Sequence, residues 1–305
     1  MVNTYYDLAT LFYEWGWGES FHFAYKHVFE SFAESIRRHE YELAAKLGVV
    51  SRDSKIIDVG CGIGGPLRAI TRFTHADVTG VTLNHYQVAR GNELCERDPL
   101  VNGKGRLVQG DFLDLPFGND SFDAAYAIEA TCHAPDRVKV YKEVARVLKP
   151  GSIFACYEWC MTDNYEKGNP EHEEIKKNIE EGDGLPDICH TSVCAKALAD
   201  AGFEVLETRD MAKDDIGPYG HPWYLPLTPS WNPLTQRFQF NWLGYRLTVV
   251  MLQIMEFCYL APKGTYKTQQ MLQKGGFGLG KGGKQKIFTP MYLMVGRVPE
   301  GKKQK

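Results

Sequence analysis

The residues of this 305-residue chain that are best able to do chemistry begin with a glycine-rich turn. Residues 56–66 read IIDVGCGIGGP, a pattern typical of an apolar strand that turns tightly into a helix. Gly60, Gly62 and Gly65 match the GxGxxG pattern of dinucleotide-binding proteins. The turn is therefore expected to hold a cofactor, and the pattern alone leaves open which one.

The carboxylate of Asp58 separates two classes of cofactor. A dinucleotide needs backbone N–H groups and positive charge around its diphosphate, whereas Asp58 puts negative charge at the end of the strand. S-adenosylmethionine has no phosphate and carries an ammonium and a sulfonium group, so it suits a carboxylate better. We therefore favour a methyl donor over a dinucleotide, and we expect it to contact Asp58, Gly60, Cys61 and Gly62.

The next two apolar runs also end in polar residues. A dinucleotide site expects an acid about 20 residues beyond the glycines, to bond the ribose, but the second run ends at Asn84. Asparagine can still bond a ribose, and we assign Asn84 and Gln87 to the cofactor. The third run is followed by Asp111 and Phe112, which would accept from the adenine amine and stack on its ring.

Acid–base chemistry is expected from the carboxyl ends of the later strands. Residues 126–135 read YAIEATCHAP and place Glu129 and His133 where doubly wound sheets form their crevice. In a helical turn these two side chains meet at i,i+4 and form a proton-accepting pair. Glu158, at the end of a fifth strand, is a similar candidate. The alternative for all three is a solvated or merely hydrogen-bonded residue.

An aromatic segment stands close to the N-terminus. Residues 12–23 read FYEWGWGESFHF, which sets six aromatic rings and a histidine around two glycines. Rings of this size often form part of a core. Because the glycines favour a loop, we prefer a lid that covers a ligand.

Alternating strand and helix signals must position these groups. From residue 23 to residue 47 apolar residues recur at helical spacing, with Val28, Phe32, Ile36 and Leu43 on one side. Asp136 is a good N-cap for a helix over 137–148, and another helix is expected near 190–201. Strands are expected near 55–60, 78–83, 106–109, 122–127, 151–158, 203–206 and 287–295, with Pro290 at an edge or bulge. This alternation predicts an α/β fold, a parallel sheet covered on both faces.

Composition excludes several classes of function. The net charge of −3, without a basic block before the last few residues, gives no indication of a nucleic-acid partner. The eight cysteines form no CxxC pair, so we expect reduced thiols, with neither a metal site nor a disulfide framework. The first residues lack a secretory signal, so we expect an intracellular, cytosolic protein.

The C-terminal third has a different character. Residues 217–233 are crowded with prolines and aromatics, which suits an irregular lid or lobe. Residues 238–261 are apolar enough to suggest a membrane span, but they contain Arg246 and Glu256. We prefer a buried amphipathic helix to a helix lying on a membrane surface. The chain then divides into an N-terminal segment (1–50), a cofactor-binding core (51–210) and a C-terminal region (211–305).

Taken together, these segments resemble the sterol C-24 methyltransferases, which are class I S-adenosylmethionine-dependent enzymes of sterol biosynthesis. The resemblance runs from about residue 5 to residue 298. It is carried by the aromatic segment 13–23, the cofactor loop 57–66, the signature regions 126–135 and 157–163, and the C-terminal motifs at 222–224, 261–265 and 287–290.

The resemblance implies a doubly wound, mostly parallel seven-stranded sheet with one antiparallel strand, an aromatic N-terminal lid and an α-rich C-terminal lobe. The implied reaction is methyl transfer to C-24 of a Δ24 sterol side chain through a tertiary carbocation, which gives a 24-methylene sterol. The implied catalytic residues are Glu129, His133, Tyr13 and Glu14. The implied substrate-binding residues are Trp15, Trp17, Phe21, His22, Phe23, Glu158 and Trp223.

The resemblance leaves some properties open. Family members carry a longer leader before the aromatic segment, so peripheral contact with the endoplasmic reticulum membrane stays open, as does assembly into homo-oligomers. The rival enzyme would methylate phosphoethanolamine, a tocopherol or a fatty acyl chain. The rival from another class is a lipid-binding relative without turnover.

Overall fold

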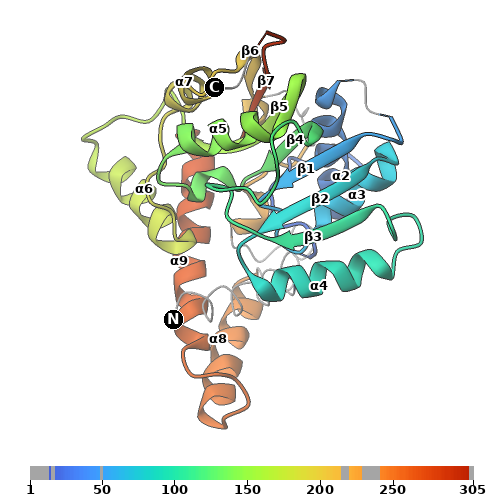
Figure 1. The fold of residues 1–305 in the computed structure, drawn as a ribbon. Coiled ribbons are helices and arrows are strands. Elements are labelled where there is room, and N and C mark those ends of the chain that lie inside the picture. The colour runs from blue at the N-terminus through green and yellow to red at the C-terminus, as the bar shows by residue number, and fades with distance from the viewer. Residues whose placement is uncertain (1–13, 15–17, 49–50, 214–219, 229–240, 302–305) are drawn as a thin grey trace.

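A seven-stranded sheet runs through the molecule, in the order β3-β2-β1-β4-β5-β7-β6 (Figure 1). The computed structural model describes residues 14, 18–48, 51–213, 220–228 and 241–301. The strands are β1 (Lys55–Val59), β2 (Asp77–Thr82), β3 (Gly105–Gln109), β4 (Phe122–Ile128), β5 (Leu148–Met161), β6 (Glu204–Asp210) and β7 (Phe288–Arg297). The first five strands pair in parallel, and β7 runs antiparallel to both of its neighbours. The predicted α/β sheet with one reversed strand is confirmed.

Strand β7 lies between β5 and β6 in the sheet and pairs with both. Glu158 pairs with Tyr292 while Cys160 pairs with Thr289, so the register shifts at Pro290. A proline cannot donate to a strand ladder, and a bulge removes the need for that hydrogen bond. The predicted edge or bulge at Pro290 is therefore a bulge inside the sheet.

Helices cover both faces of the sheet. Residues of α2, α3 and α4 share one apolar cluster with β1 and β2, and residues of α5 and α7 share the other. The long helix α9 packs against α6, and α8 lies beside the lower part of α9 (Figure 1). The helices are α2 (Phe32–Ala44), α3 (Gly65–Thr74), α4 (His85–Glu96), α5 (Arg137–Val147), α6 (Pro170–Asp183), α7 (Thr191–Asp200), α8 (Trp242–Phe257) and α9 (Thr265–Lys284).

Side-chain caps fix where several helices begin. Ser31 and Glu34 form a reciprocal capping box at the start of α2, and Asn84 caps α4 by accepting from the N–H of Gln87. Asp136 caps α5 by accepting from the N–H of Lys139 at 3.1 Å. Such caps satisfy backbone donors that the first helical turn leaves unpaired. The predicted cap at Asp136 is confirmed.

The predicted helix over residues 23–47 is wrong in its first third. The α-helix begins only at Phe32 and is followed by a short 3₁₀ turn, Ala45–Leu47. Val28, predicted on the buried side, is exposed, whereas Ile36 and Leu43 are buried. Residues before Ser31 instead bond to other elements, and Lys26 forms an isolated bridge with His221. Helical periodicity could not reveal these distant partners.

The predicted buried helix within 238–261 is also wrong in its packing. Helix α8 forms, but only Gly244 and Leu252 along it are buried, and most of its large apolar side chains are exposed. Among the described residues, no helix combines the length and the apolar character needed to cross a bilayer.

Candidate active site

The glycine-rich turn lies where β1 ends and α3 begins, and its backbone is unusual. Gly60, Gly62 and Gly64 have positive φ angles of 85°, 54° and 75°. A Cβ at Gly60 would stand 2.4 Å from the Cβ of Ala130, the second residue after β4. Only glycine fits here, because L-residues rarely adopt this φ and the neighbouring strand's loop leaves no room.

Asp58 sits at the end of β1, directly before the turn, and is almost completely buried. Its Oδ2 accepts a hydrogen bond from the hydroxyl of Tyr126 on β4 at 2.9 Å. Burial raises the pKa of Asp58 to about 7, although the Tyr126 hydrogen bond acts in the opposite direction. A positively charged amino or sulfonium group bound nearby would lower the pKa of Asp58 again. The carboxylate would then be ionised and could pair with that group.

The other predicted cofactor residues surround the same edge of the sheet. The N–H of Cys61 donates to the Val81 carbonyl, and a Cβ on Gly80 would lie 2.6 Å from the Cys61 sulfur, so this thiol is part of the core. The side chain of Asn84 caps α4, while Gln87 accepts from the Thr82 hydroxyl at 2.6 Å.

The third strand contributes the last pair of predicted cofactor residues. Asp111 follows β3 and accepts from the N–H of Leu113 at 2.8 Å, and Phe112 packs partly buried beside it. Their roles towards a cofactor stay predictions. The structure places them at the carboxyl edge of the sheet, next to the end of β2, which Asn84 follows by two residues.

A segment that we call the strap, residues 18–23, crosses over the glycine-rich turn. A Cβ on Gly65 would lie 2.2 Å from the carbonyl oxygen of Glu19, and a Cβ on Gly62 would touch the ring of Phe21 at 3.5 Å. The carboxylate of Glu19 pairs with Arg68 on α3 at 2.5 Å. The strap therefore covers the turn, and the role of the aromatic segment as a lid over a ligand stays a prediction.

Glu129 lies directly after β4, and the strap reaches it. Its Oε1 accepts from the N–H of Phe23 at 2.8 Å, and its Oε2 accepts from the indole N–H of Trp159 at 2.8 Å. Glu129 also has a positive φ of 52°, a conformation unusual for a non-glycine residue and frequent at functional sites. Burial raises its pKa to about 8, although nearby His22 and the Trp159 hydrogen bond act in the opposite direction.

The predicted pair of Glu129 with His133 is not formed. The backbone turns into a 3₁₀ helix over Thr131–His133, the His133 residue is exposed, and both Glu129 oxygens bond elsewhere. An i,i+4 contact requires continuous α-helix, which the positive φ of Glu129 interrupts.

Glu158 is fully buried in a network of its own. It accepts from the hydroxyl of Thr131, from the hydroxyl of Tyr141 at 3.3 Å and from the N–H of Trp159, and Arg137 lies 3.7 Å away. These partners account for its burial without a substrate. Its predicted contact with substrate stays a prediction.

His22 forms a buried pair with Glu40 of α2. Its Nε2 lies 3.1 Å from Glu40 Oε1, and its Nδ1 lies 3.0 Å from the carbonyl oxygen of Phe23. A carbonyl only accepts, so Nδ1 carries a proton, and a single further proton is shared between Nε2 and the carboxyl group. Burial lowers the pKa of His22, but the hydrogen bond and charge of Glu40 outweigh it and leave the pKa raised.

Four buried aromatic side chains form a cluster beside Glu129. Phe23 meets Trp223 at a ring-centroid distance of 5.1 Å and Trp159 at 5.9 Å, and Phe288 completes the cluster at 5.4 Å from Trp159. We call these residues the ring cluster. It joins the strap, β5, residues 220–228 and β7, and it brings together Phe23 and Trp223, whose contact with substrate stays a prediction.

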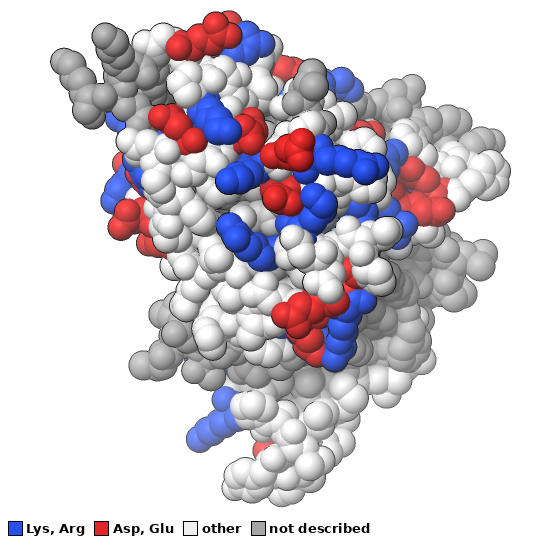
Figure 2. Space-filling view, turned by 45° about the vertical axis from the view of Figure 1, so that its right-hand side comes forward, with Lys and Arg blue, Asp and Glu red and all other residues white. Residues whose placement is uncertain are grey.

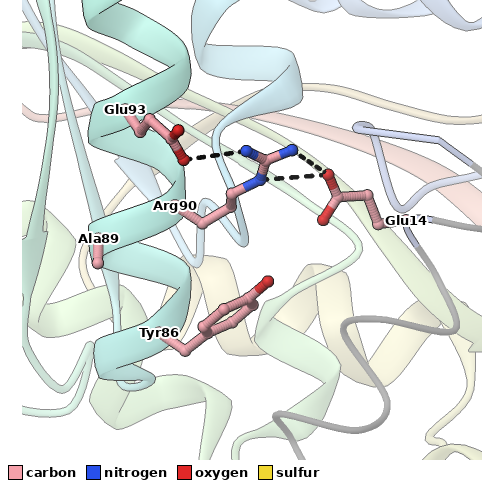
Figure 3. A pocket seen from close by; sticks show the side chains of 5 residues that line it. All are labelled: Glu14, Tyr86, Ala89, Arg90 and Glu93. Carbon is pink, nitrogen blue, oxygen red and sulfur yellow. Dashed lines mark hydrogen bonds and ion pairs between the residues drawn. The ribbon is translucent and has the colours of Figure 1, made fainter.

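Glu14, a predicted catalytic residue of the N-terminal segment, lies against α4. Its carboxylate pairs with Arg90 at 2.6 Å, and Arg90 also bonds Glu93 at 3.0 Å (Figure 3). These residues, with Tyr86 and Ala89, line a pocket of about 620 Å³. Its charged lining does not suit a sterol body, which needs apolar walls. Tyr13, Trp15 and Trp17 lie outside the described residues.

Two site residues escaped the sequence analysis. Trp159 donates to Glu129, and its only signal was its position next to Glu158 at the end of a strand. Glu40 holds His22, and its signal was a charged residue on the apolar side of α2, between Ile36 and Leu43. A charge at a core position is expected to have a partner, but the partner is 18 residues away.

Comparisons with known proteins agree with this geometry. Residues 57–156 match the family model "Methyltransferase domain", and residues 235–300 match "Sterol methyltransferase C-terminal". Cycloartenol-C-24-methyltransferase 1 of Oryza sativa subsp. japonica is 53% identical over 98% of this chain and 85% of its own length. The chain belongs to the sterol C-24 methyltransferase family. Sterol 24-C-methyltransferase ERG6 of Saccharomyces cerevisiae is 46% identical over 98% of this chain and 78% of its own length.

Solved structures support the fold of this family member. The cyclopropane synthase MmaA2 of Mycobacterium tuberculosis superposes with a TM-score of 0.70 over 97% of both chains, at 15% identity. A geranyl diphosphate C-methyltransferase of Streptomyces coelicolor A3(2), solved with S-adenosyl-L-homocysteine, gives 0.66 over 96% of this chain and 98% of its own, at 18% identity. The protein is thus a C-methyltransferase with the class I fold, and S-adenosylmethionine is its methyl donor.

Proposed function

We propose that this protein transfers the methyl group of S-adenosylmethionine to C-24 of a Δ24 sterol side chain and releases a 24-methylene sterol. One observation carries the proposal beyond family membership. A buried carboxyl group, Glu129, lies between the ring cluster and the glycine-rich turn, bonded to Trp159 on one side and preceding Ala130 on the other. An acid in an apolar, aromatic wall suits a reaction that passes through positive charge.

The chain offers a fitting set of groups for the donor. When bound, S-adenosylmethionine supplies an electrophilic methyl group. Asp58 would hold its positively charged end, because a buried carboxyl with a pKa near 7 ionises readily beside a cation. Asn84 and Asp111, at the ends of neighbouring strands, would hold the ribose and the adenine. Gly60 and Gly62 keep the turn free of side chains.

The alkene of a Δ24 sterol needs alignment rather than activation by a base. The strap and the ring cluster would provide that alignment and would exclude water, which otherwise quenches a carbocation. Ring faces also stabilise positive charge, by about 1–2 kcal/mol each when desolvated. Phe23, Trp159 and Trp223 are the described residues for this task; Tyr13, Trp15 and Trp17 are candidates from the sequence alone.

The last step removes a proton. After methyl transfer the cation at C-25 takes a hydride from C-24, and the new C-24 cation loses a proton from the transferred methyl group. We assign this proton to Glu129 in its carboxylate form, which the passing cation and the N–H donors of Phe23 and Trp159 favour. Once ionised, it is a better base than an exposed carboxylate, because burial raises its pKa. The His22–Glu40 pair, next along the strap, would tune Glu129 by its charge, in place of the predicted partner His133.

Product analysis of Glu129→Gln tests the assignment. Purified protein is incubated with methyl-labelled S-adenosylmethionine and cycloartenol or a Δ24 sterol without 4-methyl groups. We expect wild-type label in a 24-methylene sterol, independent of added chelator, and a loss of about 10²–10⁴-fold in the variant. Glu204→Gln, on the exposed side of β6, is the matched control and should keep full activity.

The outcomes separate the rival functions. Label in a phosphoethanolamine, tocopherol-precursor or fatty acyl acceptor, with none in any sterol, would replace the proposed substrate class. Binding of both ligands without label transfer would indicate a lipid-binding relative. Full turnover of Glu129→Gln to the 24-methylene product would remove this residue from the proton step while leaving the overall function intact.

A further inference from the structure

The C-terminal lobe, which we define as residues 242–284, ends in an apolar surface that no described residue covers. Helix α8 carries Leu243, Leu247, Val250 and Ile254 at alternating spacings of four and three, and all four side chains are exposed. This spacing places them along one face of the helix. At about 1.5 Å per residue, the 11 steps from Leu243 to Ile254 give an apolar stripe about 17 Å long on this 16-residue helix.

The stripe continues into the turn after α8, at the tip of the lobe. Phe257 is 85% exposed, Tyr259 95% and Leu260 73%. The lobe extends away from the sheet, so its tip can meet a flat surface without obstruction by the core (Figure 1). Figure 2 shows the lower end of the molecule as a largely uncharged surface. Three adjacent large apolar side chains in water are unusual for a surface without a partner.

Charge around the tip is positive. Between residues 242 and 270 the charged side chains are Arg246, Glu256, Lys263 and Lys267. The carboxylate of Glu256 turns inward and accepts from two backbone N–H groups at the start of α9, at 2.6 and 3.2 Å. Arg246, Lys263 and Lys267 are exposed. An apolar face with a cationic rim complements an anionic, apolar layer.

We propose that this surface docks on a lipid bilayer that carries anionic headgroups, with α8 lying in the interface and the tip inserted. A second copy of the chain fits less well, because symmetric pairing of the same face would bring its three cations towards their own counterparts. The docking rests on the proposed function in one respect, because a sterol substrate resides in lipid. The apolar surface itself is a property of α8 and the turn after it, whatever the substrate.

The natural cysteines provide a site-specific probe. Cys258, next to the tip, is the only exposed cysteine, because six of the other seven are buried and Cys189 is partly so. An environment-sensitive fluorophore on Cys258 would report insertion. We expect its emission to shift to the blue with vesicles of phosphatidylcholine and phosphatidylserine, and spin-labelled lipid to quench it. The same label on Leu100→Cys in a Cys258→Ser background is the control, because Leu100 is 61% exposed on the core.

Co-sedimentation with the same vesicles measures the strength of docking. Phe257→Ser and Leu260→Ser should each weaken binding about tenfold, from the apolar area that each side chain buries. Lys263→Gln and Lys267→Gln should each weaken it about fivefold, and only when phosphatidylserine is present. Leu100→Ser should bind as the wild type does.

Several results would overturn the docking. One is that the wild-type protein binds vesicles neither with nor without phosphatidylserine. Another is that Leu100→Ser weakens binding as much as Phe257→Ser does. The third is a dimer in light scattering that dissociates in Phe257→Ser. Methyl transfer to a sterol delivered in detergent is measured on every variant and should stay at the wild-type rate. If the protein does not bind vesicles but still methylates the sterol, the docking is wrong and the proposed function stands. If it binds vesicles as expected but does not methylate the sterol, the docking stands and the proposed function is wrong.

Discussion

Binding of the methyl donor should depend on pH through Asp58. In the donor-free protein the pKa of this buried carboxyl is about 7 instead of 3.8, chiefly because of burial. A cation beside it favours the ionised form, so binding must release the proton of the protonated fraction. At pH 7 about half of the molecules would release a proton from Asp58.

The size of the effect follows from the shift. If the bound donor restores the ordinary pKa, affinity changes tenfold for each pH unit below 7 and levels off above it, so binding at pH 6 should be about tenfold weaker than at pH 8. If the donor's charge also reaches Glu129, whose pKa is about 8, this residue would release a proton as well. The affinity would then keep rising between pH 7 and pH 8 instead of levelling off. The shift of about three units sets an upper limit of roughly 4 kcal/mol on the linkage at Asp58.

The same shift predicts the stability of the donor-free protein. A carboxyl whose folded pKa is raised loses stabilisation as the pH rises from about 4 through about 7. Asp58→Asn has no such charge, so it should melt at a higher temperature than the wild type at pH 8, and the difference should shrink towards pH 5. Scanning calorimetry without donor measures both.

Titration calorimetry of donor binding at pH 6, 7 and 8, in buffers of different ionisation enthalpy, gives the affinity and the number of protons released. Asp58→Asn should bind more weakly and should release fewer protons at pH 7. Tyr126→Phe, which removes the hydrogen bond to Asp58 and keeps the carboxyl group, is the matched control and should retain proton release. Equal affinity at pH 6 and 8 with no proton release would refute the assignment of Asp58 to the positive end of the donor.

Three further substitutions test other contacts. Trp159→Phe removes the N–H donor to Glu129 and keeps a ring, so the pKa of Glu129 should rise. Because a base acts only when deprotonated, the ascending limb of the pH–rate profile should move to higher pH with little change in KM; an unmoved limb would contradict a proton role for Glu129. Glu40→Gln takes away the charge that raises the pKa of His22. NMR titration should therefore give a lower pKa for His22 in this variant, and an unchanged pKa would contradict the shared proton. Gly60→Ala introduces a methyl group at a φ of 85° with a neighbour 2.4 Å away, and should destabilise the protein by about 2 kcal/mol or more in urea unfolding.

Local rules were sufficient for most elements of the fold. The strand, glycine turn and helix around Asp58, the N-cap at Asp136 and the returning strand at Pro290 were all predicted correctly, because each depends on residues within a few positions of one another. The same rules place the predicted cofactor residues at one edge of the sheet, since parallel strands bring their carboxyl ends together.

Distant contacts were not available from the sequence. The partners of Glu129 are Phe23, 106 positions earlier, and Trp159, 30 positions later, and only packing of the strap on β4 and β5 brings them together. The i,i+4 rule chose His133 instead, and it failed where Glu129 leaves the helical region. The prediction that α8 is buried failed for the same reason. Amphipathic spacing shows which face of a helix is apolar, but not whether another element covers that face.

The sequence by itself determined the order of strands and helices, the glycine turn and the family, all of which are written in neighbouring residues or in whole motifs. Tertiary structure decided the protonation of Asp58 and Glu129, the pairing of His22 with Glu40 and the exposure of the tip at Phe257. The physical reason is that desolvation and electrostatic coupling depend on what surrounds a group in space, and for these residues the surroundings come from segments far along the chain.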